Sequence, residues 1–194
     1  VDGVASIVSG FYRTWDQARF DALAREFEIP TRRRIAALSR GMRAKAALAL
    51  AMAHHAELLL LDEPTAGLDP VFRQRLLEHL SAYVASGEAS VLLSTHITSD
   101  LERLADYITY VRNGRLVFST TRDEIADTWA IVKGPPDRFT ADCRALFAGW
   151  EAGAHAFTGL TRDADAVRRQ FGGEPLIVER ASLEDIMFLM GRSC

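Results

Sequence analysis

The chain has 194 residues, of which 48% are hydrophobic and 25% charged, and its formal net charge is −3. This composition is ordinary for a globular protein, and the length fits one domain, or one domain with a small appendage, around a real core. The nearly balanced charge gives no reason to expect nucleic-acid binding.

Cysteine usage and the apolar segments bear on the compartment. Cys143 and Cys194 lie far apart and lack metal-ligand spacing, so we expect free thiols in a reducing compartment. No basic segment followed by an apolar one opens the sequence, so a signal peptide is not expected. The longest apolar stretch, residues 44–53, contains Lys45 and is too short to cross a bilayer. We therefore expect any link to a membrane to come through a partner.

The first element expected is a helix over residues 4–28. Thr14-Trp15-Asp16-Gln17 fits a capping box. Apolar side chains then recur at helical spacing along one face, at Phe20, Leu23, Ala24 and Phe27. Pro30 ends this helix, and the basic run at residues 32–34 is interpreted as a solvated connector.

A second helix is expected over residues 40–54, with Ser39 as its N-cap and a composition rich in Ala, Leu and Met. The apolar run at 58–61 ends in Asp62-Glu63-Pro64. A short apolar run bounded by turn residues is typical of a strand buried on both faces of a parallel sheet.

Asp69 is expected to cap the next helix, which has Pro70 at its first position and ends near Gly87. A strand ending at His96, a short helix and a hairpin then follow, over residues 90–95, 99–105 and 107–119. The dipeptide Asn113-Gly114 is a strong hairpin signal. We therefore expect an antiparallel edge beside the parallel core.

After about residue 128 the pattern changes to short alternating strands and helices. Strands are expected at 129–133, 154–158 and 175–180, and helices at 137–147, 162–171 and 182–190. Ser182-Leu183-Glu184-Asp185 forms a capping box that opens the last helix. This predicts a small α+β appendage, either a packing or dimer-stabilising domain or a ligand-sensing one.

Two acidic residues, Asp62 and Glu63, directly follow the apolar run. The carboxyl end of a buried parallel strand is where ligands bind in α/β sheets. Asp62 is placed to hold Mg²⁺, directly or through water, and Glu63 could orient and deprotonate an attacking water. The simpler alternative is a pair of solvated acids at a strand-to-turn junction.

Ser39 and Gly41 stand at the start of the helix over residues 40–54. A hydroxyl, a glycine N–H and a positive helix end form an anion-binding site, although an ordinary N-cap has the same residues. His96 can reach a γ-phosphate from beside Glu63, although a lone histidine at a strand end is more often structural.

In their order and spacing these residues resemble the ATP-binding-cassette (ABC) ATPases. Residues 38–42 are similar to the signature motif, 58–62 to the Walker B strand and 66–69 to the D-loop. Glu63 is similar to the catalytic base of this family and His96 to its switch histidine.

The resemblance covers roughly residues 5–120 and extends to a subgroup. Phe-Tyr-Arg-Thr-Trp at 11–15 and Leu-Ser-Arg-Gly-Met at 38–42 are similar to the bacitracin- and lantibiotic-type multidrug export subunits. Arg40 and Met42 depart from the commonest signature, which has Gly and Gln there. Arg40 could favour phosphate or contact a neighbouring subunit.

The resemblance implies an α/β fold, a partial P-loop NTPase (ABC ATPase) fold with a mostly parallel sheet. We expect the partial ATPase domain over residues 1–128, with a helical subdomain at 1–55 and the core at 56–128. The α+β appendage is expected at 129–194.

The resemblance also implies ATP and Mg²⁺ as cofactors, with Asp62 on the metal. It implies that four residues bind nucleotide, namely Ser39, Arg40, Gly41 and Asp69. The implied partners are a second ATPase subunit, as a homodimer or heterodimer, and a membrane-spanning permease. The implied location is cytoplasmic, peripheral at the inner face of the cell membrane.

One part of the family pattern is missing. Its P-loop, Gly-x-x-x-x-Gly-Lys-Ser/Thr, grips the β and γ phosphates. Lys45 and Lys133 follow Ala44 and Val132, so the sequence contains no Gly-Lys pair, and the Gln loop is absent too. We therefore expect a C-terminal portion of a cassette, beginning inside the helical subdomain. It should hydrolyse negligible ATP alone, expose apolar strand faces and unpaired edges, and self-associate.

The leading prediction is an ATP-binding and ATP-hydrolysing subunit of an ABC exporter. Two alternatives stay open, a non-transport ABC-type ATPase and a catalytically silent regulatory or binding module. A P-loop encoded upstream of Val1, and neighbouring genes for membrane-spanning proteins, would discriminate among them.

Overall fold

The computed structural model describes residues 1–172 and 176–192. The chain packs as two compact units, Val1–Ile97 and Thr98–Cys194. This division falls earlier than the domain boundary predicted after residue 128, because the segment after Ile97 shares a core with the C-terminal sheet. The assignment of residues 1–128 to the ATPase domain and of 129–194 to the appendage remains a prediction.

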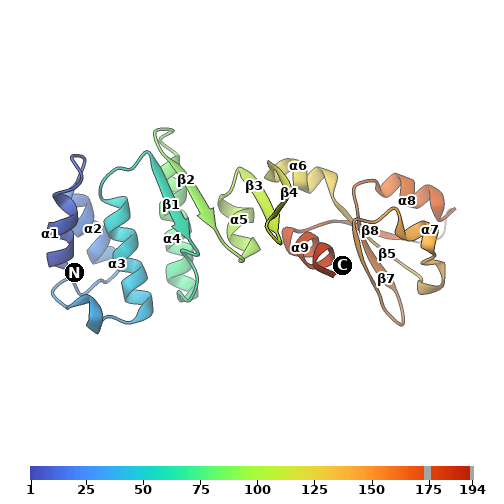
Figure 1. Cartoon of the computed structure of the whole chain (residues 1–194), viewed down its shortest axis with the longest axis horizontal. Helices are drawn as coiled ribbons and strands as arrows, with labels where there is room; N and C mark the ends of the chain where they lie inside the picture. Colours follow the sequence, from blue (N-terminus) through green and yellow to red (C-terminus); the bar gives the residue numbers. More distant parts are fainter. Residues whose placement is uncertain (173–175, 193–194) are drawn as a thin grey trace. The chain divides into compact units, whose positions relative to one another are not determined.

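Helices open the first unit, as Figure 1 shows: α1 (Asp2–Ser9), α2 (Gln17–Glu26), the 3₁₀ turn η1 (Ile35–Ala37) and α3 (Arg40–Met52). The prediction of one helix over 4–28 is wrong, because the chain leaves α1 after Ser9 and Asp16 starts a new helix. Asp16, not Thr14, is the N-cap, and its carboxylate accepts a hydrogen bond from the Arg19 amide at 2.9 Å. The predicted apolar face of this segment is buried as expected, at Phe20, Leu23, Ala24 and Phe27.

A parallel strand pair completes this unit. β1 (Leu58–Asp62) and β2 (Ser90–Ser94) pair in parallel with Asp62 opposite Ser94, and α4 (Pro70–Val84) connects them. Parallel neighbours require such a crossover. The Asp69 carboxylate caps α4 by accepting from the Phe72 amide at 2.9 Å, as predicted.

The faces of this strand pair differ in exposure. Leu59 on β1 is 3% exposed, whereas Leu60 is 68% exposed and Leu92 on β2 is 65% exposed. The prediction of strands buried on both faces is therefore wrong, and the expected exposed apolar face is confirmed. The parallel part of the predicted sheet is confined, within the described residues, to β1 and β2.

The second unit begins with α5 (Thr98–Leu104), the hairpin of β3 (Tyr107–Arg112) and β4 (Arg115–Thr121), and α6 (Arg122–Thr128). Asn113 and Gly114 have φ values of 49° and 70°, the left-handed conformation that a two-residue hairpin turn requires. The hairpin forms its own two-stranded sheet. The expected antiparallel edge on the parallel sheet is therefore wrong, because in the described ranges neither β3 nor β4 pairs with β1 or β2.

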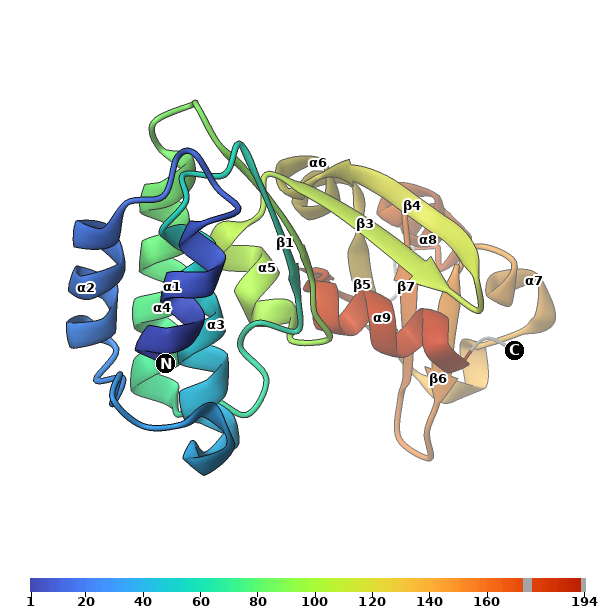
Figure 2. The same cartoon turned by 60° about the vertical axis from the view of Figure 1, so that its left-hand side comes forward.

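The remaining strands form a four-stranded antiparallel sheet in the order β6-β7-β5-β8. Figure 2 labels β5, β6 and β7 of this sheet. Its elements are β5 (Ala130–Gly134), the turn η2 (Pro136–Arg138), α7 (Ala141–Arg144), β6 (Gly149–Ala152), β7 (Phe157–Thr161), α8 (Ala164–Gln170), β8 (Ile177–Arg180) and α9 (Leu183–Arg192). The β-α-β-β-α-β order up to β8 is that of the ferredoxin-like split βαβ motif. The predicted α+β character of this segment is confirmed.

Two details of that prediction are wrong. The helix expected over 137–147 shrinks to η2 and α7, and the strand β6 was not predicted. The reason lies in tertiary packing, since Phe139 and Phe147 enter an aromatic core around Phe157. β6 lies at a sheet edge, where Gly149 lets the Leu189 carbonyl approach closely.

Both faces of the four-stranded sheet are covered. Val132, Phe157 and Val167 belong to a core on one side, and Ile131, Leu160 and Ile186 to a second core with α9 and the hairpin. The predicted capping box of α9 is confirmed, because the Ser182 hydroxyl accepts from the Asp185 amide while the Asp185 carboxylate accepts from the Ser182 amide.

The cysteine prediction is confirmed in part. Cys143 is a free thiol, and its burial raises its pKa. Cys194 lies outside the described residues, as does Pro175, where a strand was expected to begin. Among the described helices none has the length and apolar character needed to cross a membrane.

Candidate functional site

Glu63 lies directly after β1 in an unusual backbone conformation. Its φ is +46°, in the left-handed region that costs a residue other than glycine about 1 kcal/mol or more. Two backbone hydrogen bonds hold it there. Its amide donates to the Ser94 carbonyl at 2.9 Å, and its carbonyl accepts from the Ala66 amide at 3.1 Å. The strain is therefore fixed by the end of β2 and by the turn that follows.

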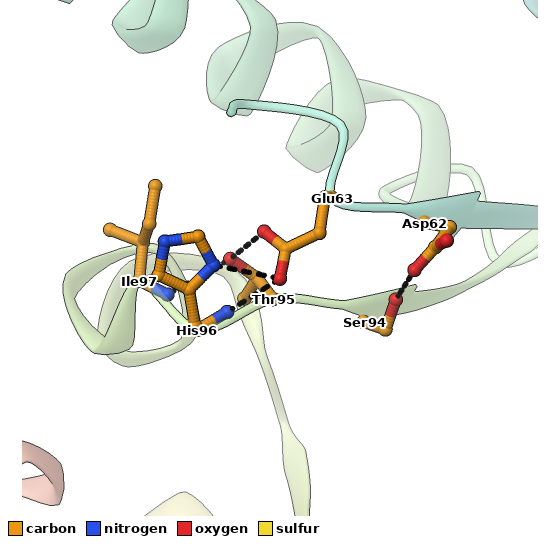
Figure 3. A network of polar contacts seen from close by, with 6 residues as sticks. All are labelled: Asp62, Glu63, Ser94, Thr95, His96 and Ile97. Atoms are coloured by element: carbon orange, nitrogen blue, oxygen red, sulfur yellow. Dashed lines mark hydrogen bonds and ion pairs between the residues drawn. The ribbon is translucent and has the colours of Figure 1, made fainter. Parts of the chain in front are cut away.

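The Glu63 side chain reaches the end of β2, as Figure 3 shows. Its Oε1 accepts from the His96 amide at 3.1 Å and lies 2.8 Å from His96 Nδ1. A carboxylate only accepts, so we assign the proton of this contact to Nδ1. The Thr95 hydroxyl donates to Oε2 over a longer 3.5 Å and accepts from the Ile97 amide at 3.0 Å. Oε1 is thus firmly held and Oε2 only weakly.

His96 projects away from the protein. Its side chain is 73% exposed, against 37% for Glu63, and Nε2 has no partner among the described residues. With Nδ1 protonated, Nε2 accepts a hydrogen bond when the ring is neutral and donates one only when the ring is charged. The ring can therefore hold Glu63 on one side and meet a ligand on the other.

Asp62 faces a different neighbour. Its Oδ1 accepts a hydrogen bond from the Ser94 hydroxyl, its cross-strand partner, and Oδ2 is free of partners within the described part of the chain. No group of three or more metal-binding side chains occurs among the described residues. An exposed carboxylate with one free oxygen still suits Mg²⁺, which usually takes one or two protein carboxylates plus water and phosphate oxygens.

The segment between Glu63 and α4 is built from two turns. The Leu68 amide donates to the Thr65 carbonyl at 3.2 Å, and Gly67 has a φ of +73°. Thr65 is 3% exposed and anchors the turns, and Asp69 then caps α4. The hydrogen bond from the Phe72 amide, aided by the positive charge of Lys45, holds the pKa of Asp69 below its ordinary value.

Ser39, Arg40 and Gly41 lie at the start of α3. The Ser39 hydroxyl accepts from the Met42 amide at 3.2 Å, and the Arg40 side chain is exposed. A Cβ placed on Gly41 would meet nothing within 4 Å, and the φ of this residue is not positive. Neither steric crowding nor backbone conformation within the described residues therefore requires glycine at this position.

The structure brings together some predicted site residues but not others. Asp62, Glu63 and His96 meet at the carboxyl ends of β1 and β2, whereas Ser39–Gly41 stand on a separate helix. In Figures 1 and 2 the starts of α3 and α4 and the ends of both strands lie toward the same lower end of this unit. The roles of these residues remain predictions.

Sequence reasoning missed the partners of the two carboxylates. Ser94 and Thr95 contact Asp62 and Glu63, and the signal for them was available in the hydroxyl pair directly before His96. The left-handed conformation of Glu63 has no such signal, because glutamate does not favour it.

Known proteins match this chain over its ATPase-like part and beyond. A family model described as "AAA domain, putative AbiEii toxin, Type IV TA system" matches residues 20–99. A solved structure entitled "Structure of ATP binding subunit of ABC transporter" superimposes with a TM-score of 0.56 and 35% identity, covering 63% of this chain and 51% of that one. The fold is therefore that of the ABC class of ATPases.

Within this class the chain is a homologue of ABC transporter ATP-binding proteins. It is 32% identical over 169 residues to the Nod factor export ATP-binding protein I of Neorhizobium galegae, covering 82% of this chain and 48% of the relative. It is 34% identical over 92 residues to the lantibiotic transport ATP-binding protein SrtF of Streptococcus pyogenes, covering 47% and 40%. The ABC transporter ATP-binding protein YtrB of Bacillus subtilis is 29% identical over 126 residues, covering 65% and 43%. The chain therefore spans about half the length of these relatives.

Proposed function

We propose that this sequence supplies the catalytic carboxylates and the signature face of an ATP-hydrolysing subunit of an ABC exporter. One observation carries this proposal, the Glu63–His96 contact of 2.8 Å at the carboxyl ends of a parallel strand pair. The homologous Nod factor and lantibiotic transport proteins support export as the process.

In this proposal Glu63 accepts the proton of the water that attacks the γ-phosphate. The weakly held Oε2 is the oxygen that faces the water, because the His96 ring and amide occupy Oε1. His96 orients Glu63 through Nδ1 and presents Nε2 toward the phosphate. Asp62 would hold Mg²⁺, which would neutralise negative charge on the phosphate oxygens.

The nucleotide itself would be bound between subunits. No Gly-Lys pair occurs in this sequence, so it contains no P-loop that could bind the phosphates of a nucleotide in the same subunit. Ser39, Gly41 and Arg40 would instead face the nucleotide of a second ATPase subunit, with Asp69 beside it. We propose such a dimer docked on a membrane-spanning permease at the inner face of the cell membrane, with no nucleic acid partner.

The test measures ATP hydrolysis in two forms of the protein. One form is this chain alone, and the other carries a Gly-x-x-x-x-Gly-Lys-Ser/Thr region before Val1, as encoded or as a fusion to the N-terminal half of an ABC relative. We expect hydrolysis only in the longer form, and a loss of about 100-fold or more on Glu63→Gln.

A matched variant is Glu57→Gln, which changes an exposed glutamate just before β1 and should leave the rate unchanged. Retention of the full rate in the Glu63→Gln variant would contradict the role of Glu63. A rate in the chain alone that Glu63→Gln abolishes would contradict the need for a P-loop.

A further inference from the structure

Lys45 lies at a contact between the helix that carries Ser39 and Gly41 and the helix that follows Glu63. It is one of only two lysines in a chain with 21 arginines. Its Nζ sits 4.0 Å from the centroid of the Phe72 ring, a cation–π distance. Lys45 belongs to α3, six residues after Ser39, whereas Phe72 belongs to the first turn of α4.

The ring under Lys45 is fixed in place. Phe72 is 3% exposed and packs edge-to-face on Phe27 of the α2 end, with centroids 4.9 Å apart. Its own amide donates the capping hydrogen bond to Asp69. The Lys45 ammonium group therefore contacts a side chain that is buried and fixed in the first turn of α4.

Asp69 links this contact to the catalytic segment. Asp69 ends the two-turn segment that begins at Glu63, and the positive charge of Lys45 adds to the Phe72 hydrogen bond in lowering the pKa of its carboxyl. A change in the first turn of α4 would thus be transmitted over six residues to Glu63.

We propose that Lys45 is a positioning residue, holding the first turn of α4 and the Glu63–Asp69 segment in register with the Ser39–Gly41 face through the Phe72 ring. The catalytic effect of Lys45 rests on the proposed ATPase function, whereas the contact between Lys45 and Phe72 lies within this chain and does not depend on it. Arginine can replace the cation over an aromatic ring, whereas an uncharged side chain cannot.

The first arm of the test uses this chain as it is. Lys45→Met keeps length and apolar stem but removes the charge, and Lys45→Arg restores a cation. NMR should show faster exchange of the Phe72 amide and an upward shift of the Asp69 carboxyl titration in Lys45→Met, both reversed in Lys45→Arg. Lys133→Met is the matched control, because Lys133 pairs with Glu179 in the other unit and should move neither signal.

The second arm uses the longer, P-loop-containing form. Lys45→Met should lower kcat for ATP about fivefold to tenfold, the size of one cation–π contact, with KM unchanged because the P-loop binds the nucleotide. Unchanged NMR signals in the Lys45→Met variant would overturn the contact, whatever the ATPase does. Altered NMR signals with an unchanged kcat would overturn the positioning role while leaving the proposed function intact.

Discussion

Glu63 has a strained backbone, and its carboxylate is held by contacts with the end of β2. Its left-handed φ is stabilised by Ser94 and Ala66 from either side, and its side chain by Thr95 and His96. Strain that surrounding contacts over-determine is common at functional sites, because it presents a side chain that a relaxed turn would point elsewhere. Here it turns the Glu63 carboxylate toward the end of β2, while the preceding Asp62 contacts Ser94.

Gly41 offers a test of whether function or packing dictates a residue. Glycine in a helix is less favourable than alanine by about 0.5–1 kcal/mol, and open space surrounds the position of its missing Cβ. We expect Gly41→Ala to raise the free energy of unfolding of this chain by up to about 1 kcal/mol, measured by urea denaturation. A stabilising effect of Gly41→Ala would show that the stability of this chain does not require glycine at position 41.

The control is Gly149→Ala in β6. A Cβ there would lie 2.5 Å from the Leu189 carbonyl oxygen, so overpacking should destabilise the chain by about 1–3 kcal/mol. A clear loss of stability in Gly41→Ala would contradict the interpretation of Gly41, since it would point to a packing role that the structure does not contain.

At the scale of elements, the start of α4 depends on the charge of Asp69. The hydrogen bond from the Phe72 amide, and then the Lys45 charge, lower the pKa of Asp69 from 3.8. A carboxyl with a lowered folded-state pKa adds stability that is present above the unfolded value and is lost as the pH falls through the folded value. This contribution should therefore begin to fall below about pH 4 and be lost once the pH is below the lowered pKa of Asp69 in the folded chain.

Asp69→Asn separates the charge from the cap. Asparagine caps helices about as well as aspartate, so the helix should keep its start while losing this pH dependence. We expect the urea midpoints of wild type and variant to differ at pH 7 and to converge toward pH 3. Asp142→Asn, at an exposed acid with no hydrogen bond among the described residues, should shift neither comparison. A constant gap between wild type and Asp69→Asn at both pH values would refute the charge effect.

Elements with local signals could be predicted from the sequence. Ser39, Asp69 and Ser182 each cap the expected helix, and Asn113-Gly114 forms the expected turn. Failures occurred where tertiary contacts decide. No local pattern indicates that Phe139 and Phe147 would leave a helix for an aromatic core.

The candidate site shows the same limit. The order of Ser39, Asp62, Glu63, Asp69 and His96 along the chain was enough to indicate an ABC ATPase. The hydroxyl pair before His96 marked Ser94 and Thr95 as polar strand-end residues, but their pairing with Asp62 and Glu63 joins segments about thirty residues apart and depends on how the two strands align.

At the scale of the whole molecule, one face of the parallel strand pair exposes apolar side chains. Leu58, Leu60 and Leu92 alternate with inward residues, so they share one face, and they are 53%, 68% and 65% exposed. Leu59, which points to the opposite face, is buried. An apolar face beside unpaired strand edges is the usual setting for association.

We expect this chain to self-associate through that face in a concentration-dependent manner. Leu60→Lys should shift the equilibrium toward monomer, because a lysine at the centre of the face would be buried without a partner in the associated form. Ile7→Lys is the matched control, since Ile7 is an equally exposed aliphatic residue, at 65%, on the helix α1. Size-exclusion chromatography with light scattering over a range of concentrations measures both variants. A wild-type chain that stays monomeric at high concentration, or an Ile7→Lys effect as large as that of Leu60→Lys, would mean that the face of Leu58, Leu60 and Leu92 does not drive association.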